Sequence, residues 1–230
     1  MPVRRPRISA VIPALNAAGT LPATIACLAS LADEVIVVDG GSRDQTASLA
    51  RAAGAHVVTA PRGRGRQLRE GAAFAKGEWL LFLHADTRLT QGAGAALTAF
   101  LEKPDHTKAA GYFDFRLDDS SPEARLLERR VAWRCRVFAL PYGDQGLFLH
   151  RSFYHELSGY RDMPLMEDVD LIWRIERRFG KQAICPMGAT AVTSSEKFRK
   201  SGYFRRSARN LFCLFLFWIK VPPSLIVKLY

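Results

Sequence analysis

The sequence lacks several features that would assign it to a common class of protein. No apolar run approaches the roughly 20 residues that a membrane-spanning helix needs, and the longest candidate is 211–219. The basic N-terminus is followed by the apolar run 8–12, which Pro13 ends and which is too short for the core of a signal peptide. The chain also shows no internal repeat and no low-complexity tract. We therefore expect a folded protein without a spanning segment or an export signal.

Cysteine is scarce, and its spacing excludes a common metal site. The cysteines form no Cys-x-x-Cys pair, so the spacing typical of structural zinc is absent. Each lies in an apolar stretch, which is typical of reduced, buried thiols and predicts a cytoplasmic protein. The cysteines are Cys27, Cys135, Cys185 and Cys213.

Acidic residues are outnumbered by basic ones in this chain of 230 residues. There are 22 Asp and Glu against 33 Lys and Arg, which gives a formal net charge of +11. Such a balance favours anionic partners, such as nucleic acid, an anionic membrane surface or a phosphorylated substrate, although general solubility explains it equally well. The chain carries no recognised nucleic-acid-binding motif, so we expect no nucleic-acid partner.

The first half of the chain alternates between short apolar strands and helices. The pattern predicts strands at 7–12, 34–38, 56–59 and 79–83, and helices at 21–31, 45–53 and 67–75. The run 79–83 is apolar throughout, as in a strand with both faces buried. This alternation predicts an α/β fold with a mostly parallel central sheet flanked by helices.

The second half is less regular. We expect helices at 90–101, 122–138 and 167–179, strands at 109–117, 147–149, 182–185 and 190–193, and a helical turn at 153–157. The best candidate for a boundary between the two halves of the chain is the polar connector 103–108. We expect a single domain over 1–230, with one half at 1–105, a second at 106–200 and a C-terminal helical tail at 201–230.

Polar side chains follow three of the predicted parallel strands. Asn16, Asp39 and Asp86 lie at or just beyond the carboxyl ends of strands that should share one rim of the sheet. A strand-end carboxylate such as Asp86 is well placed to hold a hard cation and, through it, a phosphate. The simpler alternative for Asp86 is that it caps the turn before Thr87.

Two further features point to phosphate and acid–base chemistry. The stretch 61–66 reads as a flexible loop in which Arg64 and Arg66 could bind phosphate before a helix N-terminus, or as a solvated basic loop. Glu167 and Asp168 open a helix far along the chain. One of them could act as a general base, or both could simply complement the helix dipole.

Four stretches together resemble the family 2 glycosyltransferases of the GT-A, Rossmann-like fold. They are residues 8–16, 37–46, 75–86 and 165–170, in the order that the family shows. The stretches 143–146 and 164–169 further resemble a small bacterial subgroup described as radical-SAM/selenodomain-associated glycosyltransferases. The resemblance implies a hexosyltransferase-like enzyme that moves a sugar from a UDP- or GDP-sugar to an acceptor hydroxyl. It leaves the acceptor unidentified.

The resemblance also implies roles for individual residues. Asp168 would be the catalytic base with Glu167 beside it, and Asp86 would be the last acidic residue of the Asp-x-Asp metal motif, holding Mn²⁺ or Mg²⁺. Nucleotide-binding positions would be Pro13, Ala14, Asn16, Asp39, Arg64, Arg66 and Ala85. The acceptor-side candidates are Asp144 and Gln145, in a glycine-bracketed loop that could equally be a polar turn. Displacement at the anomeric carbon would invert its configuration.

The chain departs from the family pattern at four positions. Ala17 replaces the usual Glu, Gly40 replaces the second Asp after the second strand, and Arg69 stands where Asn is common. His84 occupies the first acidic position of the metal motif, which weakens the expectation of a metal.

The C-terminal segment combines basic and apolar residues. The basic residues are Lys197, Arg199, Lys200, Arg205, Arg206 and Arg209, and the apolar run 211–219 follows them. This order favours a helix that binds the inner face of an anionic membrane, although packing on the domain or a dimer contact would also explain it.

Two other functions remain open on sequence grounds. A metal-dependent nucleotidyltransferase would normally carry a Gly-rich, basic signature after the first strand, where this chain has residues 13–16. A non-catalytic nucleotide-sugar or membrane-surface binding module would bind the nucleotide without turnover.

Overall fold

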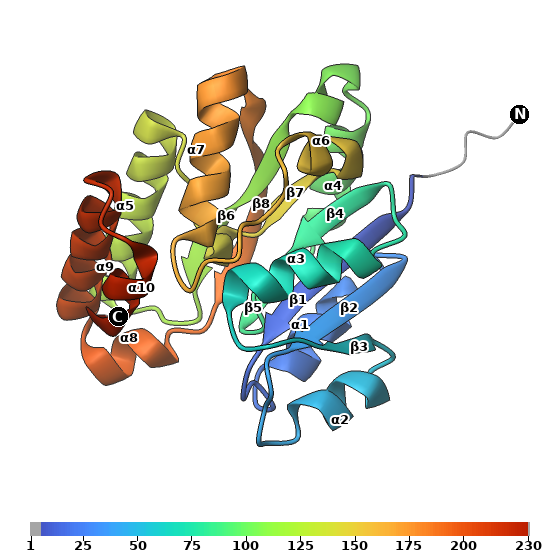
Figure 1. Cartoon of the computed structure of the whole chain (residues 1–230), viewed down its shortest axis with the longest axis horizontal. Helices are drawn as coiled ribbons and strands as arrows, with labels where there is room; N and C mark the ends of the chain where they lie inside the picture. The colour runs from blue at the N-terminus through green and yellow to red at the C-terminus, as the bar shows by residue number, and fades with distance from the viewer. Residues whose placement is uncertain (1–5, 230) are drawn as a thin grey trace, which may run out of the picture.

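A computed structural model describes residues 6–229 of the chain (Figure 1). Its strands form one eight-stranded sheet in the order β3-β2-β1-β4-β7-β6-β8-β5. The strands are β1 (Ile8–Ala14), β2 (Glu34–Asp39), β3 (His56–Thr59), β4 (Trp79–Phe82), β5 (Thr87–Leu89), β6 (Ala110–Leu117), β7 (Leu147–His150) and β8 (Ile184–Thr193). This single sheet draws strands from both halves of the sequence, and it confirms the α/β class.

The sheet is parallel where the sequence alternates regularly. β1 pairs in parallel with β2 and with β4, and β2 pairs in parallel with β3. Every residue of β1 and β4 is buried, which explains why β4 is apolar throughout and why β1 is apolar except at Ser9. The helices between these strands are α1 (Leu21–Leu28), α2 (Thr46–Ala52) and α3 (Arg64–Phe74). The carboxyl ends of β1, β2 and β4 therefore lie along one rim, as predicted.

The other half of the sheet is mixed. β7 runs antiparallel to both β4 and β6, β5 runs antiparallel to β8, and β6 and β8 are parallel. Further helices are α4 (Ala93–Leu101), α5 (Pro122–Phe138), α6 (Arg151–Glu156) and α7 (Glu167–Phe179). Short 3₁₀ helices are η1 (Pro104–Lys108), η2 (Gly143–Gln145), η3 (Lys181–Ala183) and η4 (Val227–Leu229).

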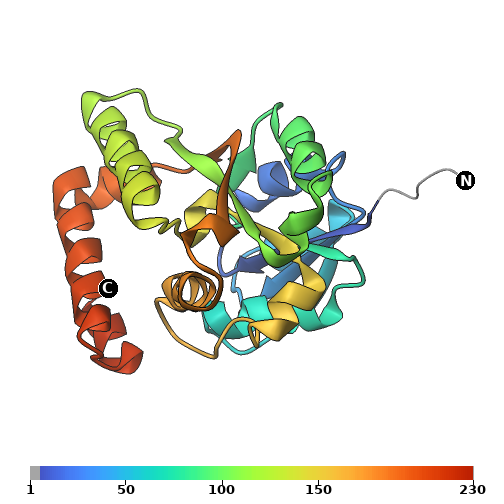
Figure 2. The same cartoon turned by 90° about the horizontal axis from the view of Figure 1, so that it is seen from above.

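Helices cover both faces of the sheet, so the core has two parts. One apolar cluster joins β1 and β2 to α3, α5, α6 and α7, and the other joins the opposite face to α1, α2 and α4. Figure 2 shows α4 and α3 on opposite sides of the sheet. The C-terminal helices are α8 (Glu196–Ser201), α9 (Tyr203–Trp218) and α10 (Pro223–Ile226). They gather with α5 at the end of the molecule opposite β2 and β3 (Figure 1).

The C-terminal helices pack on the core only in part. Cys213 of α9 and Ile226 of α10 are fully buried and join the cluster of α5 and α7. Leu211, Phe215 and Trp218 remain between 50% and 67% exposed. No helix within residues 6–229 is long and apolar enough to cross a membrane.

Several sequence-based boundaries were wrong. The stretch 61–66 is not a loop throughout, because α3 begins at Arg64 after Gly63 adopts a φ of +150°. The strands expected at 182–185 and 190–193 are parts of one strand, β8, which begins only at Ile184 and which Pro186 and Gly188 made difficult to recognise. β5 was missed because three residues with Arg88 at the centre give no apolar signal.

Candidate active site

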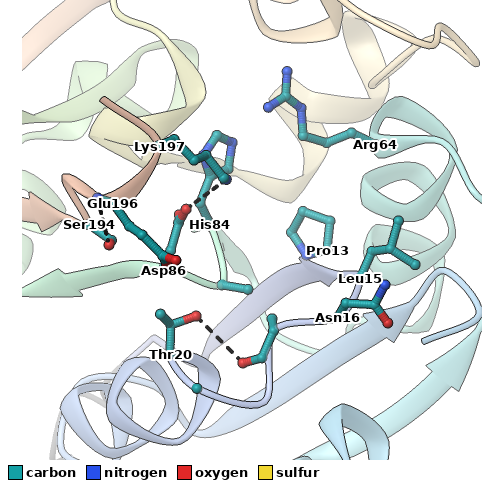
Figure 3. A pocket seen from close by; sticks show the side chains of 13 residues that line it. Pro13, Leu15, Asn16, Thr20, Arg64, His84, Asp86, Ser194, Glu196 and Lys197 are labelled. Atoms are coloured by element: carbon teal, nitrogen blue, oxygen red, sulfur yellow. Dashed lines mark hydrogen bonds and ion pairs between the residues drawn. The ribbon is translucent and has the colours of Figure 1, made fainter. Parts of the chain in front are cut away.

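A cavity of about 300 Å³ opens at the rim where β1 and β4 end (Figure 3). Its lining residues come from the loop after β1, the start of α3, the turn after β4 and the start of α8. They are Pro13, Leu15, Asn16, Ala17, Gly19, Thr20, Arg64, His84, Ala85, Asp86, Ser194, Glu196 and Lys197. Its position beyond the strand ends is the one in which open α/β sheets bind ligands.

Asn16 and Asp39 shape the rim of this cavity. Asn16 has a φ of +50°, and its backbone N–H donates to Ser42 Oγ at 2.9 Å. Its side-chain oxygen accepts from the Arg43 N–H at 2.9 Å. Asp39 is only 7% exposed and accepts from the Ser42 backbone and hydroxyl. Asn16 therefore lines the cavity, whereas Asp39 lies behind the rim and fixes the loop after β2.

Three other predicted nucleotide contacts lie at the base of the cavity or beneath it. Pro13 and Ala85 line the cavity. Ala14 is buried, and its carbonyl accepts from Gln67 Nε2 at 2.9 Å. The same Gln67 nitrogen donates to the carbonyl of Val38 at 2.7 Å, so one buried amide holds the ends of β1 and β2 together.

Asp86 forms an ion pair with Lys197, a residue of the basic C-terminal segment. Lys197 Nζ lies 2.9 Å from Asp86 Oδ2, and Figure 3 shows the two side chains pointing toward each other. Burial acts to raise the pKa of Asp86, but the charge of Lys197 and its hydrogen bond act against burial, and the pKa of Asp86 is lowered. Burial, then the charge of Arg64, lowers the pKa of His84 to about 4, so this imidazole is neutral at pH 7.

The donor chemistry at Asp86 suits a divalent cation that is also bound by a diphosphate. The cavity offers the carboxylates of Asp86 and Glu196 and the neutral imidazole of His84, and residues 6–229 contain no cluster of three or more His, Cys, Asp or Glu that could hold a metal alone. Mg²⁺ is usually held by one or two carboxylates together with substrate phosphates. The residues present fit such a shared site, with Asp86 as its carboxylate.

The two predicted arginines have different positions. Arg64 lines the cavity from the first turn of α3, and its Nε forms an ion pair with Glu167 Oε1. The Glu167 side chain is 1% exposed, and burial raises its pKa while Arg64 acts to lower it. Arg66 instead pairs with Asp162 at 3.3 Å on the surface and does not line the cavity.

Asp168 is brought to the same rim from far along the chain. Its Oδ2 accepts from the Gly143 backbone N–H at 2.8 Å, and its Oδ1 accepts from the Val169 N–H at 2.8 Å. A Cβ added to Gly143 would lie 2.6 Å from His84 Nε2 and 3.5 Å from Asp168 Oδ2. The strand end that carries Asp86 and the start of α7 therefore face each other across a glycine.

The two acceptor-side candidates, Asp144 and Gln145, differ in how their side chains are hydrogen-bonded. Asp144 is half-buried, but its Oδ1 atom is buried and has no hydrogen-bond partner within residues 6–229, and burial raises its pKa to about 6. Gln145 is 1% exposed; its amide donates to the Phe113 carbonyl at 3.1 Å and accepts from Arg134 at 3.0 Å. These hydrogen bonds favour a structural role for Gln145, whereas Asp144 Oδ1 can still accept a hydrogen bond from a ligand.

Sequence reasoning missed three elements of the site. Lys197 and Glu196 reach the cavity because β8 pairs beside β5, which puts the Ser194 N–H 3.0 Å from the Asp86 carbonyl. The Gly143 backbone donor to Asp168 has no sequence signal except the glycines at 143 and 146. Recognition of β5 would have placed the start of α8 next to Asp86.

Comparison with known proteins identifies relatives that match part of the chain. The chain is 36% identical over 107 residues to the PGL/p-HBAD biosynthesis glycosyltransferase of Mycobacterium bovis (strain BCG / Pasteur 1173P2), covering 41% of each protein. It is 34% identical over 147 residues to glycosyltransferase AglJ of Haloferax volcanii, covering 58% of this chain and 45% of that one. The chain thus spans less than half the length of these curated relatives.

Solved structures share the fold at low identity. Glucosyl-3-phosphoglycerate synthase from Mycobacterium tuberculosis, in complex with Mg²⁺ and UDP, gives a TM-score of 0.61 at 24% identity, covering 83% of this chain and 70% of that one. The same enzyme with Mn²⁺, UDP and phosphoglyceric acid gives 0.65 at 22% identity, covering 96% and 81%. These likenesses confirm the GT-A, Rossmann-like fold.

The sequence itself carries the family assignment. Residues 9–167 match the model described as Glycosyl transferase family 2. That match includes the rim with Asn16, Asp39 and Asp86 and extends to Glu167 at the start of α7. The chain belongs to glycosyl transferase family 2.

Proposed function

We propose that the protein transfers a sugar from a UDP- or GDP-sugar to an acceptor hydroxyl with inversion at the anomeric carbon. The observation that carries the proposal is the juxtaposition of Asp168 with the strand end that bears His84 and Asp86, on either side of Gly143. A base for the acceptor and a site for the diphosphate must lie this close together for direct displacement. The donor would occupy the cavity beside Asn16 and Arg64.

Asp168 would accept the proton of the attacking hydroxyl. The Gly143 N–H holds one carboxylate oxygen in position, and the second lone pair of that oxygen would take the proton. Attack on the sugar face opposite the diphosphate gives inversion. General-base assistance of this kind contributes about 10²–10⁴ in rate.

Arg64 and Asp86 would help to stabilise the negative charge of the departing nucleoside diphosphate, Arg64 directly and Asp86 through a bound cation. Arg64 faces the cavity and is positioned by its ion pair with Glu167, so it can approach the diphosphate without losing its buried partner. Asp86 would hold a Mn²⁺ or Mg²⁺ ion, whose chemistry is to neutralise negative charge on the departing nucleoside diphosphate. Lys197 must leave Asp86 when that ion is held there.

The finer assignments rest on sequence and surface features. Residues 1–105 would bind the donor and residues 106–200 would supply the base and the acceptor side. The stretches 143–146 and 164–169 support the radical-SAM/selenodomain-associated subgroup. The exposed apolar residues of α9 and the net charge of +11 support a cytoplasmic protein that binds the inner face of an anionic membrane.

A donor panel tests the proposal. The protein is incubated with UDP- and GDP-sugars in Mn²⁺ or Mg²⁺, and both nucleotide binding by calorimetry and sugar release are measured. Binding of one nucleotide with turnover of one of its sugars is the expected result. Binding without turnover of any donor, even with simple alcohols and sugars as acceptors, favours the binding-module alternative. No nucleotide binding would contradict the donor site at Asn16, Arg64 and Asp86.

A further inference from the structure

A large apolar groove lies between α5, α7 and α9, and the reaction proposed above does not account for it. Its volume is about 880 Å³, within the range of small-molecule sites. The walls include Leu127, Trp133, Phe138, Trp173, Leu211 and Trp218. Trp133, Leu211 and Trp218 are 52–67% exposed, an unusual exposure for large apolar side chains that share one hollow.

The groove adjoins the cavity that contains Asp168. Tyr142 and Asn210 line both the groove and a small cavity of about 50 Å³ that contains Asp168. Arg64 lines this small cavity and also the donor cavity. The small cavity of Asp168 therefore lies between the cavity at the ends of β1 and β4 and the groove, and it shares lining residues with both.

The polar end of the groove presents hydrogen-bond acceptors that lack donors. Asp144 Oδ1 and Asn210 Oδ1 are buried and have no hydrogen-bond partner within residues 6–229. Both residues line the groove. Buried oxygens of this kind are normally satisfied, so a ligand hydroxyl is a suitable partner for them. The apolar walls and this polar end together match a molecule with an apolar body and a hydroxylated head.

We propose that the acceptor is an amphiphile whose hydrocarbon chain lies in the groove between α5, α7 and α9. This inference rests on the proposed transferase function. The hydroxylated head would donate to Asp144 and Asn210 and present one hydroxyl to Asp168. A fully polar acceptor would leave the apolar walls unused, and a flat protein surface would not fill a hollow that adjoins the cavity of Asp168.

Calorimetric binding of two glucosides tests the groove independently of turnover. n-Octyl β-glucoside, kept below its micelle concentration, is compared with methyl β-glucoside. Each buried methylene tightens binding roughly fourfold, so four of them give an octyl preference on the order of 10²-fold. Ala208→Trp fills the groove from its exposed wall, and Ala52→Trp on α2 is the matched control. We expect the preference to fall below about tenfold in Ala208→Trp only.

The outcomes separate this inference from the proposed function. Equal affinities for the two glucosides, or an unchanged preference in Ala208→Trp, contradict the acceptor inference when nucleotide binding is intact. A wild-type dimer in size-exclusion chromatography that Ala208→Trp converts to a monomer also contradicts it, because the groove would then be a self-interface. Absence of nucleotide binding in the wild type contradicts the proposed function itself.

Discussion

At the scale of single residues, burial and neighbouring charges are balanced differently at the carboxylates of the site. Burial acts to raise the pKa of Asp86, but the charge of Lys197 acts against it, so this pKa is lowered and the carboxylate stays ionised. Asp144 has a pKa of about 6 because burial dominates, and the nearby charges of Asp168 and Asp86 add to the effect of burial while Arg134 opposes it. Carboxylates with such different pKa values in one cleft are typical of functional sites.

The raised pKa of Asp144 makes stability depend on pH. A carboxyl whose pKa is raised from 3.8 to about 6 contributes stability that is complete below pH 3.8 and is lost as pH rises through 6. As pH rises from 4 to 8, the unfolding free energy of Asp144→Asn should therefore increase by about 2–3 kcal/mol relative to that of wild type. Urea unfolding at both pH values measures this, with Asp162→Asn as control. Parallel pH profiles of wild type and Asp144→Asn would show that Asp144 is not perturbed.

The Arg64–Glu167 pair should be important for stability as well as for the donor. Arg64→Met leaves Glu167 buried without its ion pair and should cost about 3 kcal/mol of unfolding free energy. Glu167→Gln in the same chain should recover most of that loss, which a double-mutant cycle in urea measures. Arg66→Met, at the exposed pair with Asp162, should cost less than about 1 kcal/mol. Equal losses in the two arginine variants would contradict the pairing.

The positions of site residues were predictable only where the order of strands and helices along the chain determines them. Asn16, Asp86 and Asp168 follow from strand ends and a helix start, and the structure brings them to one rim. The position of Lys197 depends on β5 pairing with β8, a non-local contact with no local signal. The internal engagement of Gln145 depends likewise on Arg134 and Phe113, which lie in other elements.

At the scale of elements, α3 connects the cavity at the ends of β1 and β4 to the start of α7. Its first residue is Arg64, and Gly65 lets the segment 161–163 approach its backbone. A Cβ at Gly65 would lie 3.0 Å from the Met163 carbonyl oxygen and closer still to that of Arg161. The start of α3 was predicted too late along the chain because arginine and glycine read as loop, whereas the tertiary contact with 161–163 requires that glycine.

A glycine-to-alanine exchange tests this packing. In a helix the exchange normally stabilises by about 1 kcal/mol, but Gly65→Ala should cost about 2 kcal/mol because the methyl group meets a backbone carbonyl. It should also reduce transferase activity by displacing Arg64 from Glu167. Gly92→Ala, which has open space around it, is the control for thermal and urea unfolding. A Gly65→Ala variant as stable as Gly92→Ala would contradict the close approach.

At the scale of the whole molecule, charge and apolar exposure gather where α8 and α9 lie. The parallel half of the sheet followed from the regular alternation of strands and helices, whereas the mixed half did not, because antiparallel returns between distant strands leave no period in the sequence. The exposed face of α9 was predicted as a membrane contact, and that remains a prediction.

Vesicle binding measures the membrane contact. The protein should sediment with phosphatidylglycerol vesicles at 0.1 M salt and should lose that binding at 0.5 M salt, because salt screens the electrostatic attraction. It should not bind phosphatidylcholine vesicles, which carry no net charge. Phe212→Ser together with Phe215→Ser should weaken binding about tenfold through lost apolar insertion. Phe74→Ser, on α3 and 60% exposed, is the matched control. Similar binding to both lipids would exclude an electrostatic membrane contact.

The most direct test of the central claim is the turnover of Asp168→Asn beside Asp162→Asn. Asn keeps the shape and accepts the Gly143 N–H, but it cannot take a proton, so kcat should fall about 10²–10⁴-fold while the Kd for the nucleotide stays within about twofold. Asp162 lies on the surface opposite Arg66, and its variant should keep wild-type turnover. Full activity in Asp168→Asn, with folding and nucleotide binding intact, would contradict Asp168 as the base.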